Sequence, residues 1–345
     1  MEPSKIEESI DFRPASELLW QQLRSLIAEH IGYFHSFTRL ASLWLCLLLL
    51  LATASALSLL VTLLIYSSPF WSAVTLATSI SSSCALFVVQ RYLTIYKNER
   101  EAQLVDKFTH GCCQAIGFRN EVADHHLALA SGYCFFAETL QSPTSPSNYH
   151  NTSLLTSFRL LLERTIDRCC LRDREQLQEK LLKCSLTEYL WLIRRDPLNL
   201  SYHSQLANSY LLLANQYQLS AQRRHRSQPL EQARRQAIEW AVKEFAIIAE
   251  YAQDDPWVYS QLADSYKQLG MSEREIDACS LLLKLCPNDS ELLIRLGRLY
   301  FSSGQQGKGL ELYRQLLSID PESASRLIEA YGQSASVNHS LDRAF

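Results

Sequence analysis

The sequence lacks the residue excesses and the charge imbalance that mark several protein classes. Its 345 residues include 10 glycines and 10 prolines, too few for a collagen-like or low-complexity chain. Lysine and arginine number 33 against 36 aspartates and glutamates, which gives a formal net charge of −3. Nucleic-acid-binding domains are usually strongly basic, so this balance argues against a nucleic-acid partner. The length allows roughly two domains of about 150 residues each.

Motifs for redox, metal or catalytic chemistry are also missing. The chain has ten cysteines, but no CxxC pair and no spacing typical of a disulfide framework. Asp106, His110 and Cys113 share one helix face, without a fourth ligand at a supporting spacing. No combination of nucleophile, base and acid is recognisable. We therefore expect reduced cysteines, no metal, no cofactor and no enzymatic activity.

Charge is absent from one long stretch of the chain. Between Leu40 and Gln90 there is no aspartate, glutamate, lysine, arginine or histidine. Residues 43–66 are strongly apolar, and at 1.5 Å per residue a helix of this length crosses a hydrocarbon core of about 30 Å. Residues 72–90 are long enough to cross as well, although they are richer in serine and threonine. The stretch predicts a two-helix transmembrane hairpin over residues 41–93, with the lipid bilayer as its surroundings.

Charges that flank the predicted hairpin fix its orientation. Arg24 and Arg39 precede it, several basic residues including Arg91 and Lys97 follow it, and the turn between the helices is uncharged. The positive-inside rule therefore predicts a multi-pass protein with two spans and both termini in the cytoplasm. Small residues at four-residue spacing on both helices are expected to let them approach closely: Ala52 and Ala56 on the first, and Ala73, Ala77, Ser81 and Ala85 on the second.

The segment before the hairpin, residues 1–40, begins with an acidic and polar stretch. After Pro14, apolar residues beginning with Leu19 recur at steps of three and four, which predicts an amphipathic helix. Two placements stay open for this helix: along the membrane surface, or packed against the C-terminal part of the chain.

A 34-residue period organises the C-terminal part. The pattern Leu262-Ala263-x-x-Tyr266 recurs 34 residues later as Leu296-Gly297-x-x-Tyr300. A glycine turn, an apolar second helix and a closing proline repeat at the same offset. A third copy begins at Leu206-Ala207-x-x-Tyr210 and is interrupted by an arginine-rich insertion. This pattern resembles the tetratricopeptide repeat, which implies stacked helix pairs that form an α-solenoid.

The resemblance also implies where a partner binds, because tetratricopeptide arrays hold extended peptides or helices in a groove lined by the first helix of each repeat. Ser204 stands where the lysine of a carboxylate clamp would be, so we do not expect a carboxylate-clamp chaperone adaptor. By pattern, the groove residues are Asn208, Leu211, Asp264, Lys267, Arg298 and Phe301.

The arginine-rich insertion is a second candidate site. Clustered guanidinium groups pair well with phosphate or carboxylate groups, so the insertion is a possible patch for an acidic partner, with a solvated loop as the alternative. Its arginines are Arg223, Arg224, Arg226, Arg234 and Arg235.

The expected fold is all-α, a transmembrane hairpin followed by an α-solenoid of tetratricopeptide-like helix pairs. Between these parts, residues 97–197 read as a helical region with a degenerate repeat whose first helix is expected around Leu154–Ile166. Repeats and a capping helix are expected over residues 198–333, and a polar tail over 334–345.

This architecture predicts a membrane-anchored scaffold whose cytosol-facing solenoid binds a protein partner. The closely spaced spans also resemble the bilobed inclusion-membrane proteins of chlamydia-type intracellular bacteria, which implies a secreted effector. The alternative is an assembly or biogenesis factor of a bacterial inner membrane that acts through its transmembrane hairpin.

Overall fold

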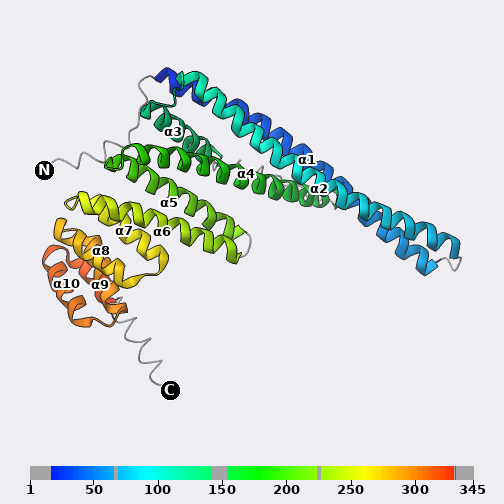
Figure 1. Ribbon diagram of the computed structural model, residues 1–345. Helices are drawn as coiled ribbons and strands as arrows, with labels where there is room; N and C mark the ends of the chain where they lie inside the picture. The colour runs from blue at the N-terminus through cyan, green and yellow to red at the C-terminus, as the bar shows by residue number, and fades with distance from the viewer. Residues whose placement is uncertain (1–16, 66–68, 141–153, 224–226, 330, 332–345) are drawn as a thin grey trace, which may run out of the picture. The chain divides into compact units, whose positions relative to one another are not determined.

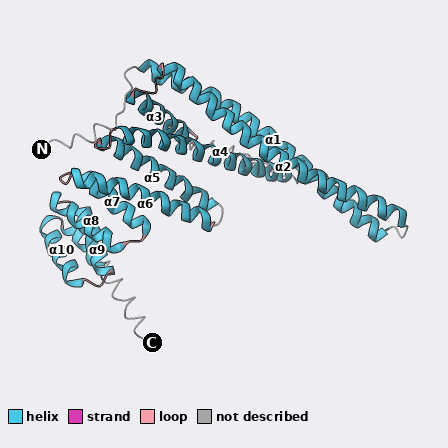
Figure 2. Ribbon diagram, in the orientation of Figure 1, coloured by secondary structure: helices cyan, strands magenta, loops and turns pink. Residues whose placement is uncertain are grey.

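The computed structural model describes residues 17–65, 69–140, 154–223, 227–329 and 331. Every regular element in these ranges is an α-helix (Figure 2), which confirms the all-α prediction. The chain divides into two compact units, and the boundary falls between Glu188 and Tyr189, inside a helix.

Two very long helices dominate the first unit. Helix α1 is Glu17–Ile65, and α2 is Pro69–Ile116 (Figure 1). They run antiparallel, because the hydroxyls of Ser55 and Ser82 share a hydrogen bond of 2.8 Å while the rings of Phe37 and Tyr96 lie 5.6 Å apart. At 49 and 48 residues, each helix extends well beyond the stretch that was predicted to cross a membrane.

The tip of this helix pair exposes large apolar side chains. Leu57 of α1 is 63% exposed and Phe87 of α2 is 65% exposed. Within the described residues, one helix is long and apolar enough to cross a membrane, the Ala73–Ile116 part of α2. The apolar stretch of α1, Cys46–Val61, is shorter than that requirement. The prediction of two spans is therefore not confirmed.

The predicted role of the small residues of α2 in the helix contact is wrong. Ala73, Ala77, Ser81 and Ala85 are all exposed. The side of α2 that is half-buried carries Thr75, Ser79, Ser82 and Leu86 instead. Both sets follow helical spacing, so the sequence could not tell which side faces α1.

Helices α3 (Ala123–Thr139) and α4 (Leu154–Arg195) complete the first unit. Its core includes Phe108 and Phe136, whose ring centroids lie 4.8 Å apart. Two ion pairs join α2 to α4, Lys97 with Asp173 at 2.7 Å and Lys180 with Glu101. Part of α1 is packed here too, since its residues Ile27, Phe34 and Ala41 are buried. The segment predicted as a separate amphipathic helix is thus the first part of α1, packed within this unit.

The second unit contains three helix pairs. They are α5 (Leu200–Arg223) with α6 (Gln228–Tyr251), α7 (Pro256–Leu269) with α8 (Ser272–Leu285), and α9 (Ser290–Ser302) with α10 (Gln306–Ile319) (Figure 1). Asp255 and Asp289 cap the first helices of the last two pairs, because each carboxylate accepts hydrogen bonds from backbone N–H groups in the first turn. Gly270 and Gly304 end α7 and α9 with φ of 73° and 77°, in the left-handed region that favours glycine. These caps explain why an aspartate and a glycine recur at the same positions of the two repeats.

The insertion in the third repeat copy lengthens helices rather than forming a large loop. Both α5 and α6 have 24 residues, whereas each helix of the α7–α8 pair has 14. The insertion thus extends the end of α5 and the beginning of α6.

The degenerate repeat is organised differently from the prediction. Residues 154–166 are not a separate first helix, because they belong to the continuous helix α4. Instead, α3 carries His126-x-x-Leu129-Ala130-x-x-Tyr133, which matches His203-x-x-Leu206-Ala207-x-x-Tyr210 of α5. Helix α3 is therefore the repeat-like first helix of the first unit.

Candidate partner-binding groove

A cavity of about 700 Å³ opens between α7, α8 and α9 in the second unit. We call it the groove. Its walls combine charged, hydroxyl and apolar side chains from two consecutive repeats: Ser260, Lys267, Glu275, Leu282, Asp289, Glu291, Leu292, Ile294, Arg295, Arg298, Leu299 and Ser302. All of these residues except Asp289, which caps α9, stand on helices, so their backbone positions are fixed by the repeat packing.

Arg295 joins the three helices of the groove. Its Nε and Nη2 donate to Oε1 of Glu275 on α8, at 3.0 and 2.9 Å. Its Nη1 donates to Oδ1 of Asp264 on α7, at 2.6 Å. Burial alone would lower the pKa of Arg295, but the hydrogen bonds to Glu275 and Asp264 outweigh it and raise the pKa above its ordinary value. The guanidinium is thus permanently charged, and with its two carboxylate partners it forms a group that carries one excess negative charge.

Two further cations on the groove are not neutralised. Lys267 and Arg298 line the cavity and are exposed. Within the described part of the chain, neither has an ion-pair partner. Apolar side chains of Leu282 and Leu299 lie on the same walls. Glu275, Asp289 and Glu291 line the same cavity, so the groove presents charged side chains of both signs beside apolar surface.

Four of the six groove residues predicted from the sequence can be compared directly with this cavity. Lys267 and Arg298 line it, and Asp264 lies beside it through its bond to Arg295. Phe301 does not line it, and its assignment to the groove is corrected. The Phe301 side chain is 4% exposed, and its ring packs 4.8 Å from that of Tyr331. A partner cannot reach it while this packing is intact.

The other two predicted residues, Asn208 and Leu211, stand on α5 in another helix pair. Both are half-buried, and neither lines the groove. The structure does not bring them together with Lys267 and Arg298.

The predicted arginine patch is also only partly available. Arg234 is 13% exposed and donates to both carboxylate oxygens of Glu231, with its shortest bond at 2.6 Å. Arg235 lies 3.8 Å from the same carboxylate, and Arg223 is exposed at the end of α5. Arg224 and Arg226 lie outside the described residues. Arg234 is thus corrected from a partner-binding residue to one committed to an ion pair within its own helix.

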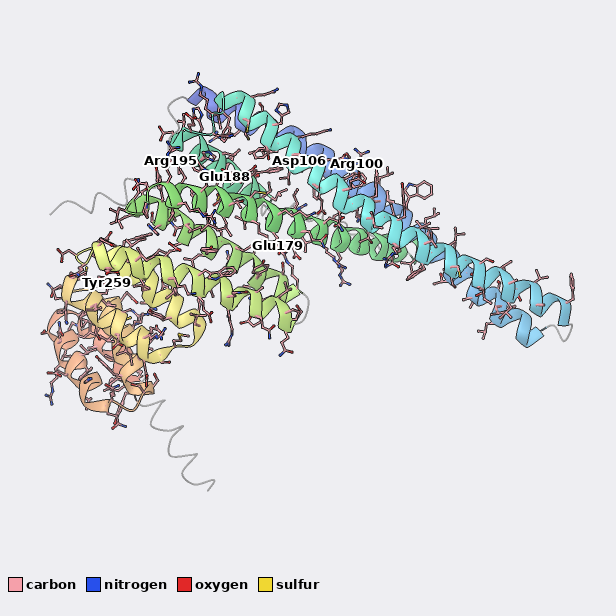
Figure 3. The ribbon with its side chains drawn as sticks, viewed as in Figure 1. Arg100, Asp106, Glu179, Glu188, Arg195 and Tyr259 are labelled. Atoms are coloured by element: carbon pink, nitrogen blue, oxygen red, sulfur yellow. The ribbon has the colours of Figure 1, made fainter. Side chains whose placement is uncertain are left out.

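Two buried histidines form matching hydrogen-bond arrangements that the sequence reading missed. His203 places Nδ1 2.6 Å from Oε2 of Glu244 and Nε2 3.0 Å from the carbonyl of Pro197. His126 places Nδ1 2.6 Å from Oε2 of Glu188 and Nε2 3.2 Å from a carbonyl six residues earlier. Figure 3 labels Glu188 on α4. Each ring faces two acceptors, so both bonds form when both nitrogens carry a proton. The sequence signal that could have revealed these arrangements is a histidine at the same position of the repeat pattern in α3 and in α5.

Metal and thiol chemistry receive no support from the described residues. Among them, no group of three histidine, cysteine, aspartate or glutamate side chains is arranged to hold a metal ion. Burial raises the pKa of the Cys279 thiol to about 11, so this thiol is protonated at neutral pH.

Comparison with known proteins gives one family match. A family model described as tetratricopeptide repeat matches residues 290–323, which include α9 and α10. Among curated proteins, no sequence relative matches the chain.

Several solved structures are similar to parts of the chain. MamA of AMB-1 is 15% identical, covers 66% of this chain and 98% of its own, and has a TM-score of 0.32. A second MamA crystal structure is 17% identical, covers 49% and 96%, and has a TM-score of 0.29. The TPR2AB domain of yeast Sti1 in complex with pHSP90 is 14% identical, covers 69% and 95%, and has a TM-score of 0.25. TM-scores this low carry no argument about the arrangement or the ligand.

The family match falls on the last of the repeat copies that the 34-residue period defines, and these residues form the expected helix pair. The predicted resemblance is thus confirmed for residues 290–323, which match the tetratricopeptide-repeat model.

Proposed function

We propose that this protein is a membrane-anchored scaffold that holds a protein partner in the groove between α7, α8 and α9. Tetratricopeptide repeats form helical scaffolds for protein interaction, and the family match places α9 in such a repeat. The observation that carries the proposal is the groove itself. It has Lys267 and Arg298 available beside apolar walls, on helices held together by Arg295.

The membrane anchor is supported by the surface of the α1–α2 tip. Its leucines, valines and phenylalanine are exposed on both helices, an arrangement that water disfavours and a bilayer accommodates. Exposed Trp44 and Tyr92 lie at the end of the apolar stretch nearest the rest of the unit, as aromatic residues do at membrane interfaces. We propose two spans, a bilayer around the tip, and both termini in the cytoplasm.

One observation favours the alternative function. The small residues Ala73, Ala77, Ser81 and Ala85 form an exposed row on α2 that α1 does not cover. Rows of this kind let membrane helices approach each other closely. An assembly factor of a bacterial inner membrane would use such a surface to contact a membrane complex, whereas a secreted effector would need the groove in the host cytosol.

Affinity capture with the full chain in detergent tests the proposed groove. The test variant is Lys267→Glu/Arg298→Glu, and the matched control is Lys284→Glu/Arg314→Glu, which reverses two exposed charges outside the groove. We expect a partner that the parent and the control both retain and the groove variant loses. A partner that the groove variant retains would refute the groove as the binding site.

Membrane anchoring has its own test. After an alkaline wash of membranes, we expect the parent chain to stay in the pellet and a Leu47→Arg/Leu57→Arg/Phe87→Arg variant to be released. Protease added to the cytosolic side should remove tags from both termini. Protection of either terminus would contradict the proposed topology.

A further inference from the structure

We propose that Glu101 of α2 is a proton-binding site that makes the joint between α2 and α4 sensitive to pH. Binding of a proton tightens this joint, and loss of the proton loosens it. Glu101 lies in the first unit, outside the predicted hairpin, which ends at residue 93. The groove belongs to the second unit and takes no part in this site.

The Glu101 side chain is enclosed where α1, α2 and α4 meet. Glu101 is 3% exposed, and it lines a cavity of about 10 Å³ together with Phe34 and Phe37 of α1 and Asp173 of α4. A cavity of this size has room for no more than about one water molecule. Glu101 has therefore lost most of the hydration that stabilises an ionised carboxylate.

The two carboxylate oxygens of Glu101 have different surroundings. Oε2 accepts a hydrogen bond from Nζ of Lys180 on α4. Oε1 is buried, and among the described residues it has no hydrogen-bond donor. A buried oxygen without a donor costs more free energy in the ionised carboxylate than in the neutral acid. Oε1 is thus the atom that takes up the proton, and the bond from Lys180 to Oε2 can persist.

The charged neighbours of Glu101 do not make up for this burial. Burial raises the pKa of Glu101, Lys180 and Lys97 oppose that effect, and Asp173 adds to it, so that the pKa lies above its ordinary value. Arg100 also lines the cavity, where its Nε and Nη2 donate to the hydroxyl of Tyr96. The side chains of α1 on the cavity wall are uncharged, and of the described residues none from α3 lines it.

The sign of the pH dependence follows from the raised pKa. The folded chain binds the proton of Glu101 more tightly than the unfolded chain does. The resulting stabilisation is fully present below the ordinary pKa of a glutamate, and it is lost as the pH rises through the higher folded value. Because the bond from Lys180 to Glu101 joins α4 to α2, the effect is expected in these two helices.

Hydrogen exchange of the full chain in detergent, followed by mass spectrometry, tests this site in a Glu101→Gln variant, whose amide mimics the neutral acid. Each rate is divided by the intrinsic exchange rate at the same pH. At about pH 8, we expect peptides around Glu101 and Lys180 to be at least about threefold better protected in the variant than in the parent, since one pKa unit corresponds to about a tenfold change. The ratio should approach one as the pH falls toward the ordinary glutamate pKa.

Two further variants make the test specific. Glu179→Gln removes a partly exposed ion pair with Lys183 on α4, and its protection relative to the parent should not depend on pH in this way. Lys180→Met removes the strongest influence that opposes the proton, so the parent's tightening should move to higher pH. Circular dichroism confirms that each variant keeps its helix content.

Two results would overturn the inference. Weaker protection in Glu101→Gln than in the parent at about pH 8 would mean that the ionised carboxylate stabilises the joint as an ordinary ion pair. A ratio of protection between Glu101→Gln and the parent that stays constant with pH would mean that Glu101 binds no proton in this range.

Discussion

The ion pair between Arg295 and Glu275 gives a prediction whose size follows from burial. Glu275 is 4% exposed, and its Oε1 accepts two hydrogen bonds from Arg295. Replacing Arg295 with methionine keeps most of the side-chain volume but leaves a buried carboxylate without its cation. Removing one partner of a buried pair costs about 3–5 kcal/mol. Because Arg295 itself is 26% exposed, we expect a loss near the lower end, about 3 kcal/mol.

The second carboxylate on Arg295 provides the contrast. Asp264 is 52% exposed, so its ion pair with Arg295 is largely solvated. Pairs of this kind contribute about 0.2–1 kcal/mol, and Asp264→Asn should cost no more than that. Removing both buried charges in Arg295→Met/Glu275→Leu should recover most of the lost stability, because apolar replacement of a whole buried pair is often neutral.

Hydrogen exchange of the full chain in detergent, followed by mass spectrometry, measures these effects locally. Peptides covering α8 and α9 report the free energy of opening for the helices that the pair joins, independently of the other repeats. Faster exchange is expected there for Arg295→Met and not for Asp264→Asn. If the two single variants show equal losses, or if the double variant is the least stable, the reasoning from burial is refuted.

Three further predictions concern packing, hydrogen bonding and pH. A Cβ on Gly309 would clash with the Phe301 ring, so Gly309→Ala should destabilise the last repeat by about 1–3 kcal/mol in urea unfolding. A Cβ on Gly307 would meet nothing within 4 Å, so Gly307→Ala should not destabilise it, and equal effects of the two changes would contradict this reasoning. His203→Ala removes the hydrogen bonds to a carboxylate and a carbonyl and should lower the free energy of unfolding by about 2 kcal/mol in the same assay. A loss under about 0.5 kcal/mol would contradict the two hydrogen bonds of His203. Hydrogen bonds from a serine and the nearby backbone lower the pKa of Asp320, so its stabilisation is present above the ordinary pKa of an aspartate and lost as the pH falls through its lower folded value. An acid titration followed by circular dichroism should show this loss, and Asp320→Asn should remove it.

The repeats were predictable because their signals are local. Leucine, a small residue and tyrosine recur at fixed positions of the first helix, and the glycines and capping aspartates stand where the backbone needs them. Lys267 and Arg298 line the cavity between α7, α8 and α9, and their helix position follows from the same period. Each of these inferences depends on one or two turns of a single helix.

The failures depended on contacts that the period does not encode. Phe301 has the helix position of a groove residue, but the chain after α10 supplies Tyr331, which covers it. The sequence pattern predicts Arg234 as an available charge, but in the structure it forms an ion pair with Glu231, one turn earlier. The continuity of α4 was also hidden, because apolar periodicity does not show whether two helical stretches are joined.

Site-specific photocrosslinking in native membranes tests the central claim most directly. A photoreactive amino acid at Ser302, which lines the groove, is compared with one at Leu281, which is exposed on α8 but does not line it. We predict a defined protein adduct from position 302 that the Lys267→Glu/Arg298→Glu change abolishes, and no such adduct from position 281. The same adduct from both positions, or one at 302 that survives the charge reversal, would contradict a scaffold that binds its partner in this groove.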